Sequence, residues 1–205
     1  MSGRVNNYEV TKRRMAEKFL DYDQEGMIRR FRLDSDKDWL RVRLLRRVYE
    51  IDRAEGIVYV AENGRRTEAG FNETMTIYDV LCNAKADAAL SEELVRVEGL
   101  VKAASTPSGE LFGGRARRFE GREREVALAC ARLGGERFGK GDVAYRLPLF
   151  DFLPVVFQFW SADEEFPPSM LLLWDRNTTD FMRFETVWYA AGYVLDRLAE
   201  QVEGN

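Results

Sequence analysis

Helix-type and strand-type spacing of apolar residues occupy separate blocks of this sequence, and this separation limits the folds open to it. The stretches WLRVRLLRRVYEID and GIVYVAENG alternate apolar and polar residues, which is typical of antiparallel strands with one solvated face. Two further stretches, DVAYRLPLFDFLPVVFQFW and SMLLLWD, are apolar enough for buried strands. Helical spacing marks residues 5–31, as two helices or one broken helix, and then FNETMTIYDVLCNAK, EREVALACARLGG and FETVWYAAGYVLDRLAEQV. Segregated blocks predict an α+β fold with a mainly antiparallel sheet flanked by helices.

The chain is long enough for one globular domain over residues 1–205, with a helical segment at residues 1–31 that packs on it. No internal repeat is visible in the sequence. Its 45% hydrophobic and 32% charged residues are ordinary for a globular protein. No window approaches the ~18 apolar residues of a membrane span, and the start lacks the apolar core of a signal peptide. The sequence therefore favours a cytoplasmic protein without a membrane partner.

Histidine is absent from the chain, and this excludes several common chemistries. Nucleophiles activated by histidine, imidazole general bases and the usual zinc sites all need this residue. Catalysis would have to use Asp, Glu, Tyr, Lys or Cys. Cys82 and Cys130 both lie in apolar helical stretches, so we expect buried thiols and no disulfide framework. No metal site is predicted.

Charge is distributed unevenly along the chain. Residues 1–53 carry 14 basic and 10 acidic side chains, whereas residues 54–205 carry 17 and 25. The whole chain has a formal net charge of −4 and a pI near 5.2. Nucleic-acid binding depends on a clustered basic face that neutralises phosphates, so we do not expect a nucleic-acid partner.

Two stretches resemble ion- or phosphate-binding loops without meeting their requirements. GGERFGKGD has the glycine and lysine spacing of a P-loop, but Gly141 stands where a Ser or Thr hydroxyl is needed, and a helix precedes it. DSDKDW resembles the start of a calcium loop, but Trp39 and Leu45 replace the required glycine and glutamate. We interpret the first stretch as a helix cap leading into a strand and the second as a solvated turn before a strand.

An arginine cluster in GGRARRFEGRERE is a candidate anion site. Arg115 and Arg118 belong to it, and their forked guanidinium groups are suited to a phosphate or carboxylate. The alternative is pairing with neighbouring acids on an exposed helix start, because glutamates interleave the arginines at Glu120, Glu123 and Glu125.

The stretch DEEFPPSMLLLWD places acids and prolines between two apolar strands. One interpretation is the edge of a ligand pocket formed by Trp160, Glu165, Trp174 and Asp175, because loops at sheet ends often carry binding residues. The other is a plain strand connection fixed by Pro167 and Pro168, which we favour. In that case the flanking core would contain Phe157, Phe159, Trp160, Leu171, Leu173 and Trp174.

One region of the chain resembles a known family. The stretch LGGERFGKGDVAYRLPLFDFLPVVFQFWSADEEFPPSMLLLWD, with IYDVLCNAK and the last helical stretch, resembles the prokaryotic family catalogued as domain of unknown function 3786. The resemblance implies a bacterial or archaeal protein, frequently from anaerobes, and brings no established activity, substrate or catalytic residue. Some relatives carry iron–sulfur-type cysteine clusters beside this domain. The two distant cysteines of this chain cannot fill the four ligand positions of such a cluster.

The sequence leaves three hypotheses of function open, with ligand, cofactor and oligomeric state unidentified. The leading one is a small-ligand or cofactor-binding accessory protein of anaerobic metabolism, with a pocket near Trp160, Trp174 and Trp188. The second is an enzyme that uses carboxylates for hydrolysis or proton transfer, with a strongly shifted carboxyl pKa in a cleft and help from Tyr78, Asp79 or Lys140. The third is a subunit that works with a protein partner, bound through the arginine-bearing face of the first strands.

Overall fold

Two five-stranded antiparallel sheets form the framework of the protein. The computed structural model describes residues 6–62, 64–101 and 113–204. The first sheet has the order β1-β2-β3-β4-β5, with β1 Asp34–Ser35, β2 Trp39–Leu44, β3 Arg47–Asp52, β4 Val58–Glu62 and β5 Arg65–Glu68. The second has the order β6-β10-β9-β8-β7, with β6 Leu94–Arg96, β7 Glu136–Arg137, β8 Val143–Phe150, β9 Leu153–Trp160 and β10 Ser169–Asp175. The predicted α+β class with antiparallel strands is confirmed.

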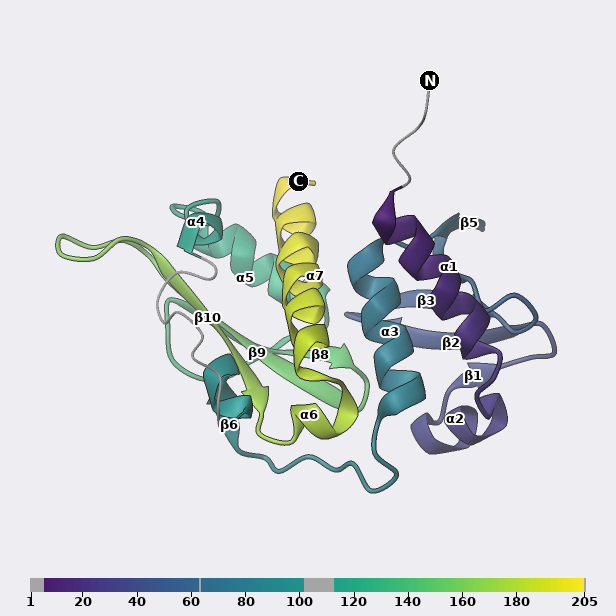
Figure 1. Ribbon diagram of the computed structural model, residues 1–205. Coiled ribbons are helices and arrows are strands. Elements are labelled where there is room, and N and C mark those ends of the chain that lie inside the picture. The colour runs from purple at the N-terminus through teal and green to yellow at the C-terminus, as the bar shows by residue number, and fades with distance from the viewer. Residues whose placement is uncertain (1–5, 63, 102–112, 205) are drawn as a thin grey trace.

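Four helices lie side by side in the order α1-α3-α7-α5 and pack against the sheets. In Figure 1 α1 and α3 lie in front of the first sheet and α7 in front of the second, and α5 crosses behind α7 and contacts β8. Their bounds are α1 Asn7–Phe19, α3 Phe71–Asn83, α5 Glu123–Arg132 and α7 Phe184–Glu203. The shorter helical segments are α2 Gln24–Phe31, the 3-10 turn Val97–Leu100, α4 Gly113–Ala116 and α6 Thr178–Phe181. No helix in the described ranges is both long and apolar enough to cross a membrane.

The core lies between the helices and one face of each sheet. Alternate strand residues point to it, because side chains in a strand alternate between faces. The inward sets are Leu40, Val42, Leu44, Tyr49 and Ile51 in the first sheet and Tyr145, Leu147, Phe157, Phe159, Met170, Leu172 and Trp174 in the second.

The prediction that Trp160, Leu171 and Leu173 lie in this core beside Trp174 is wrong, and Trp160 is only partly buried at the end of β9. Both leucines are partly exposed, and Leu172 is the buried neighbour of Trp174. The apolar run SMLLLWD hides the period of two, since leucine occupies both faces of this strand.

Local hydrogen bonds fix the start of α3 and the end of α5. Gly70 holds the cap position of α3, and the Glu73 carboxylate accepts a hydrogen bond from the Gly70 N–H at 2.8 Å. At the other end of the fold α5 closes as predicted on glycine: Gly134 has φ +80°, and the Gly135 N–H donates to the Cys130 carbonyl at 2.8 Å.

The two halves of the chain share one order of elements, although their sequences show no repeat. Each half runs from a helix (α1 or α5) through an antiparallel meander (β1 to β4 or β7 to β10) to a second helix (α3 or α7). A fifth strand, β5 or β6, pairs with the last strand of the meander in each sheet. Counterparts also touch each other, because α3 packs on α7 and β2 lies against β8. The two halves therefore contact each other through counterpart elements.

Candidate functional site

A cleft of about 120 Å³ opens where the two sheets meet, and we call it the junction cleft. It is the candidate site because it combines aromatic and aliphatic walls with a few charged groups, as small-molecule sites do. Most of its lining comes from the α2–β1 connection and strands β2 and β3, and the β8–β9 turn supplies the rest. The lining residues are Phe31, Arg32, Leu33, Asp34, Arg41, Val42, Arg43, Val48, Asp151 and Phe152.

One wall of the junction cleft begins at the end of α2. Arg32 follows the helix in the left-handed conformation, with φ +52°, and the Leu33 N–H donates to the Ile28 carbonyl at 3.1 Å. This turn carries residues 31–34 along the cleft. The ring of Phe31 stacks on that of Phe152 with centroids 4.6 Å apart, so the wall joins the first half of the chain to the second.

The β2–β3 turn locks the two sheets together beside the cleft. Leu45 and Arg46 form its two-residue tip, with φ +47° and +63°, a geometry that normally favours Asn and Gly. Leu45 is buried, and its N–H donates to the Leu149 carbonyl of β8 at 3.0 Å. Contacts with the second sheet therefore support a turn that its own residues disfavour.

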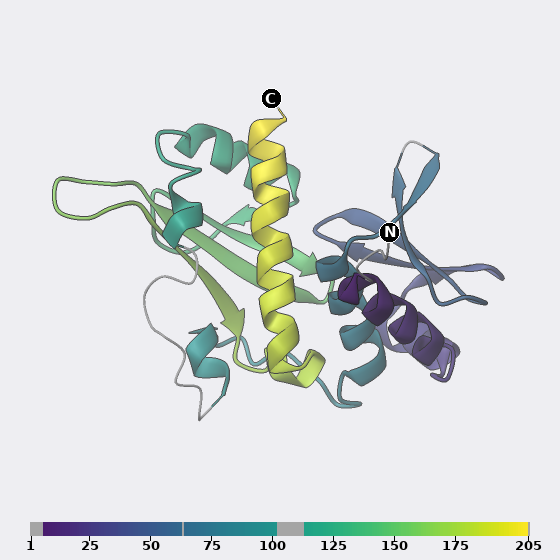
Figure 2. The same cartoon turned by 45° about the horizontal axis from the view of Figure 1, so that its top comes forward.

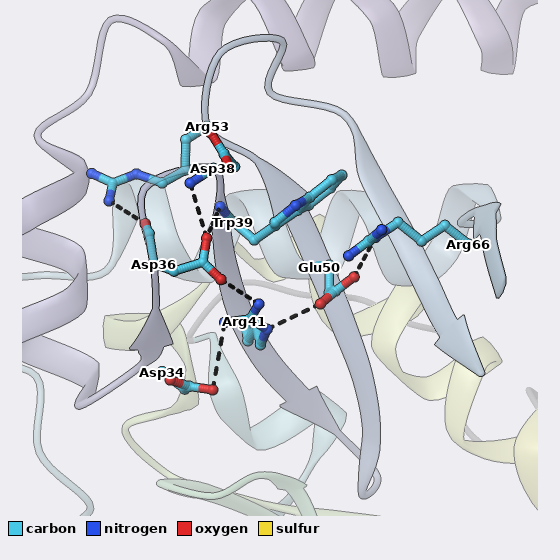
Figure 3. Close-up of polar contacts among 8 residues, drawn as sticks. All are labelled: Asp34, Asp36, Asp38, Trp39, Arg41, Glu50, Arg53 and Arg66. Carbon is cyan, nitrogen blue, oxygen red and sulfur yellow. Dashed lines mark hydrogen bonds and ion pairs between the residues drawn. The ribbon is translucent and has the colours of Figure 1, made fainter. Parts of the chain in front are cut away.

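Beside the cleft, the outer face of the first sheet carries a network centred on Arg41 (Figure 3). The Arg41 guanidinium donates to Asp36 at 2.5 Å and to Glu50 at 3.0 Å, and it lies 3.6 Å from Asp34. Glu50 also accepts from Arg66 Nε at 2.5 Å. The Arg66 guanidinium in turn lies 4.1 Å from the centre of the Trp39 ring. Arg41 is thus fully engaged by carboxylates.

The two carboxylates that bind Arg41 most closely are held in the ionised form. For Asp36, the Arg41 side chain and then the N–H groups of Asp38 and Trp39 lower the pKa from 3.8 to about 2. Burial by itself would raise the pKa of Glu50, which is 7% exposed, but the bonds from Arg66 and Arg41 outweigh it and lower that pKa. The expected solvated turn at DSDKDW is present, with the Asp36 carboxylate capping it.

Of the residues suggested by the sequence as a pocket edge, Trp160 and Trp174 are separated by the structure. Trp160 pairs with Ser169 at one end of the β9–β10 ladder, whereas Trp174 pairs with Val155 at the other. Their positions on the ladder are offset by five residues, which corresponds to roughly 16 Å. Trp174 is also fully packed in the core, with 1% of its surface exposed. Trp188, on α7, is partly buried against Phe184.

The connector between β9 and β10, residues 161–168, projects beyond the body of the protein in both views (Figures 1 and 2). Its turn is fixed by the Asp163 carboxylate, which accepts from the N–H groups of Glu165 and Phe166 at 2.9 and 2.7 Å. Glu165 is exposed at this tip. A broad groove of about 710 Å³ runs along the connector, lined by Glu123, Asp142, Trp160, Ser161, Ala162, Asp163, Phe166, Pro167 and Ser169. The connector is thus a turn that borders a groove.

Asp175 has a structural role at the end of β10. It is 1% exposed and accepts four hydrogen bonds of 2.8 to 3.0 Å, from the Ser91 N–H and hydroxyl and from the N–H groups of Glu92 and Asn177. Burial alone would raise the pKa of Asp175, but these bonds lower it. These bonds connect the segment before β6 to the turn after β10.

Arg115 and Arg118 anchor α4 to the terminal helix. Arg115 donates to Asp196 at 2.8 Å, and Arg118 donates to Glu203 at 2.5 Å. The acids that pair with both arginines belong to α7, whereas the sequence offered pairing with the neighbouring glutamates as the alternative. The signal for this arrangement is absent from the local sequence, because α7 lies about 80 residues further along the chain.

The residues proposed for carboxylate catalysis do not form one group. Tyr78 is buried and donates to the Gly56 carbonyl at 2.5 Å, and the buried Asp79 accepts from the Arg183 N–H and Nε, both at 2.7 Å. Lys140 is exposed on the β7–β8 turn of the other half.

Neither cysteine is placed or ionised as a metal ligand would be. Cys130 is buried and Cys82 is partly buried, both thiols are free, and burial raises the pKa of each to about 12. Within the described residues, no group of three or more Cys, Asp or Glu side chains is arranged to hold a metal ion. Two protonated thiols on different helices do not fit an iron–sulfur cluster.

Sequence reasoning missed the cleft residues Arg32, Arg43 and Asp151. Arg43 belongs to the predicted arginine-bearing face, but Arg32 lies in a helix end and Asp151 in a turn of the other sheet. A pattern of apolar spacing cannot show that these three positions meet, because the contact depends on how the two sheets dock.

Fold and site together define a protein with two antiparallel sheets behind one layer of helices and a small cleft at their junction. The chain belongs to the family described as Domain of unknown function (DUF3786), whose model matches residues 23–197. No curated protein and no solved structure matches the chain.

Proposed function

We propose that the protein binds a small organic ligand in the junction cleft. The observation that carries this proposal is the composition of the lining: the stacked Phe31 and Phe152 stand beside arginines, including the exposed Arg43. Apolar surface supplies affinity in such sites, and a few polar groups supply orientation and specificity. The proposal includes a cytoplasmic setting, supported by two free thiols in place of a disulfide framework.

The size of the cleft limits the ligand to a small molecule. Engineered apolar cavities of about 150 Å³ bind benzene, which has six heavy atoms. A cleft of about 120 Å³ therefore holds an apolar body of a similar or slightly smaller size, while charged groups of the ligand can extend to its rim.

Binding is better supported than acid–base catalysis. A general acid that works near neutral pH needs a carboxyl pKa raised towards 7. Two carboxylates beside the cleft have the opposite shift: the pKa of Asp36 is lowered to about 2, and that of Glu50 is lowered as well. Both are therefore ionised and weakly basic, and both are already bound by arginine.

Ligand-observed NMR tests the proposal with a set of small carboxylates, amines, zwitterions, phosphates and neutral aromatic compounds. Val48 lines the cleft and is partly exposed, so Val48→Trp should fill the space and abolish saturation transfer to the compounds that bind there. Val10→Trp on the exposed face of α1 is the matched control and should leave these contacts intact. Equal saturation transfer in both variants would show that the cleft is not the binding site.

A protein-binding role is the second candidate. The observation in its favour is Phe166, which is 65% exposed at the tip of the projecting connector. Affinity purification from the native host would test it: Phe166→Asp should lose a partner that the unmodified protein retains. Retention of the same partner by Phe166→Asp would remove this support.

A further inference from the structure

The charged groups of the junction cleft differ in how far they are already paired. Arg41 contacts Asp34, Asp36 and Glu50, so its guanidinium has little capacity for a ligand. Arg32 has no hydrogen bond or ion pair among the described residues, and its side chain is exposed. Asp34 is exposed and contacts Arg41 at 3.6 Å, so the groups open to a ligand are Arg32, Asp34 and the pair of Arg43 and Asp151.

The pair of Arg43 and Asp151 is suited to exchange its partners. The Arg43 Nη1 and Asp151 Oδ2 atoms are 3.3 Å apart, and the two side chains are 60% and 62% exposed. Exposed ion pairs contribute little to stability, so opening this pair costs little. The pair also joins β2 of the first sheet to the β8–β9 turn of the second. A ligand placed between the two groups would contact both halves of the chain.

The chemistry of this pair selects between classes of ligand. A simple anion that binds Arg43 would lie beside the Asp151 carboxylate, and a simple cation that binds Asp151 would lie beside the guanidinium groups of Arg43 and Arg32. Either ligand would meet a like charge at short range, which is unfavourable. A molecule with one anionic and one cationic group replaces both partners of the broken pair and preserves the local charge.

We propose that the ligand is a small zwitterion of the α-amino acid type with a short aliphatic side chain. Its carboxylate would bind Arg43 and Arg32, and its ammonium group would bind Asp151. The aliphatic part would pack on the apolar lining, which includes Leu33, Val48 and Phe152. L-valine fits these requirements, because its Cα carries both the ammonium group and the carboxylate, and its isopropyl group supplies the short aliphatic part. This inference rests on the proposed function and adds the ligand class to it.

Isothermal titration with three probes tests the inference. L-valine carries both charged groups, isovalerate lacks the ammonium group, and isobutylamine lacks the carboxylate. We expect L-valine to bind at least ~10-fold more tightly than either analogue, a difference of about 1.4 kcal/mol.

Two substitutions assign the charged groups separately. Arg43→Gln should weaken L-valine and isovalerate and should preserve or strengthen isobutylamine. Asp151→Asn should weaken L-valine and isobutylamine and should preserve or strengthen isovalerate. Both side chains are exposed, so neither change threatens folding. Arg65→Gln, at an exposed position on β5, is the matched control and should alter none of the three affinities.

Each alternative result has a distinct meaning. Isovalerate binding as tightly as L-valine would overturn the zwitterion in favour of a simple anion, with the cleft still the site. Unchanged L-valine affinity in both variants would overturn the assigned contacts. If none of the three probes binds while Val48→Trp still abolishes other NMR contacts, the ligand class is wrong and the proposed function stands. If no compound loses its NMR contacts in Val48→Trp, both proposals are refuted.

Discussion

Arg41 shows how a charged side chain can be structural while its neighbour remains open to a ligand. Arg41 and Arg43 lie on the same face of β2, two residues apart. The first is bound by three carboxylates, whereas the second has one exposed partner. The difference arises because Glu50 lies directly opposite Arg41 on β3, whereas Val48 lies opposite Arg43. Cross-strand neighbours therefore decide which arginine is available.

The network around Arg41 should make part of the stability depend on pH at the acid end. The pKa of Asp36 is about 2 in the folded protein, below its ordinary value of 3.8, so folding favours the ionised form. This stabilisation is fully present above about pH 4 and is lost as the pH falls towards 2. Asp36→Asn should therefore lower the free energy of unfolding at pH 7, and the difference from the unmodified protein should shrink below pH 4.

Urea unfolding between pH 2 and 7 measures this effect. Asp38→Asn is the control, because Asp38 engages Asp36 through its backbone N–H. It should leave the pH dependence near that of the unmodified protein. A difference between Asp36→Asn and the unmodified protein that stays constant from pH 7 to 2 would contradict the assignment.

At the scale of elements, the β2–β3 hairpin is shaped by the sheet it docks against. Its tip residues are not ones that adopt left-handed backbone readily, since each such non-glycine residue costs roughly 1 to 2 kcal/mol. Burial of Leu45 and its bond to Leu149 offset this cost. The hairpin is therefore formed together with the contact between the sheets.

Asparagine at each tip position separates the two contributions. Arg46→Asn should be neutral or stabilise the protein by up to about 1 kcal/mol, because Asn tolerates the left-handed conformation and the Arg46 side chain is exposed. Leu45→Asn gains the same tolerance but loses a buried side chain, so we expect destabilisation of about 2 to 4 kcal/mol. Urea unfolding of the pair measures both values. Equal effects of the two substitutions would show that docking does not hold the turn.

The sequence predicted the strands of this hairpin but not the position of its turn. Alternation over WLRVRLLRRVYEID correctly predicted antiparallel strands, but LLRR contains no turn residue, so the position of the reversal was not visible. The closing glycine of α5 was visible because the left-handed conformation there is a local requirement. Elements that depend on neighbouring residues could be predicted from the sequence. The junction cleft could not, because it depends on docking between segments that are far apart in the sequence.

At the scale of the whole molecule, the two halves are joined through buried polar contacts as well as packing. The hydroxyl of Tyr49, on β3, donates to that of Tyr193, on α7, at 2.8 Å, and Tyr193 donates to the Leu44 carbonyl at 3.2 Å. These bonds connect the first sheet to the terminal helix of the second half. We therefore expect the halves to unfold together.

Native-state hydrogen exchange tests this coupling. Amides in the central strands β3 and β9 should open with the same free energy in the unmodified protein, since both need global unfolding. Tyr193→Phe removes both bonds and leaves the Tyr49 hydroxyl without its acceptor, so it should lower both values by the same amount, about 1 to 3 kcal/mol. A decrease confined to β3 would show that the halves unfold separately.

At the junction α3 contacts its counterpart α7, and β2 contacts its counterpart β8. In a true two-fold dimer every contact occurs twice, so residues near the axis must suit copies of themselves. Here both partners belong to one chain, and equivalent places in the two meanders can hold different residues. The β2–β3 tip contains Leu45 and Arg46, whereas the β8–β9 tip contains Asp151 and Phe152. Joining the halves in one chain thus makes an asymmetric cleft possible, with opposite charges on its two walls.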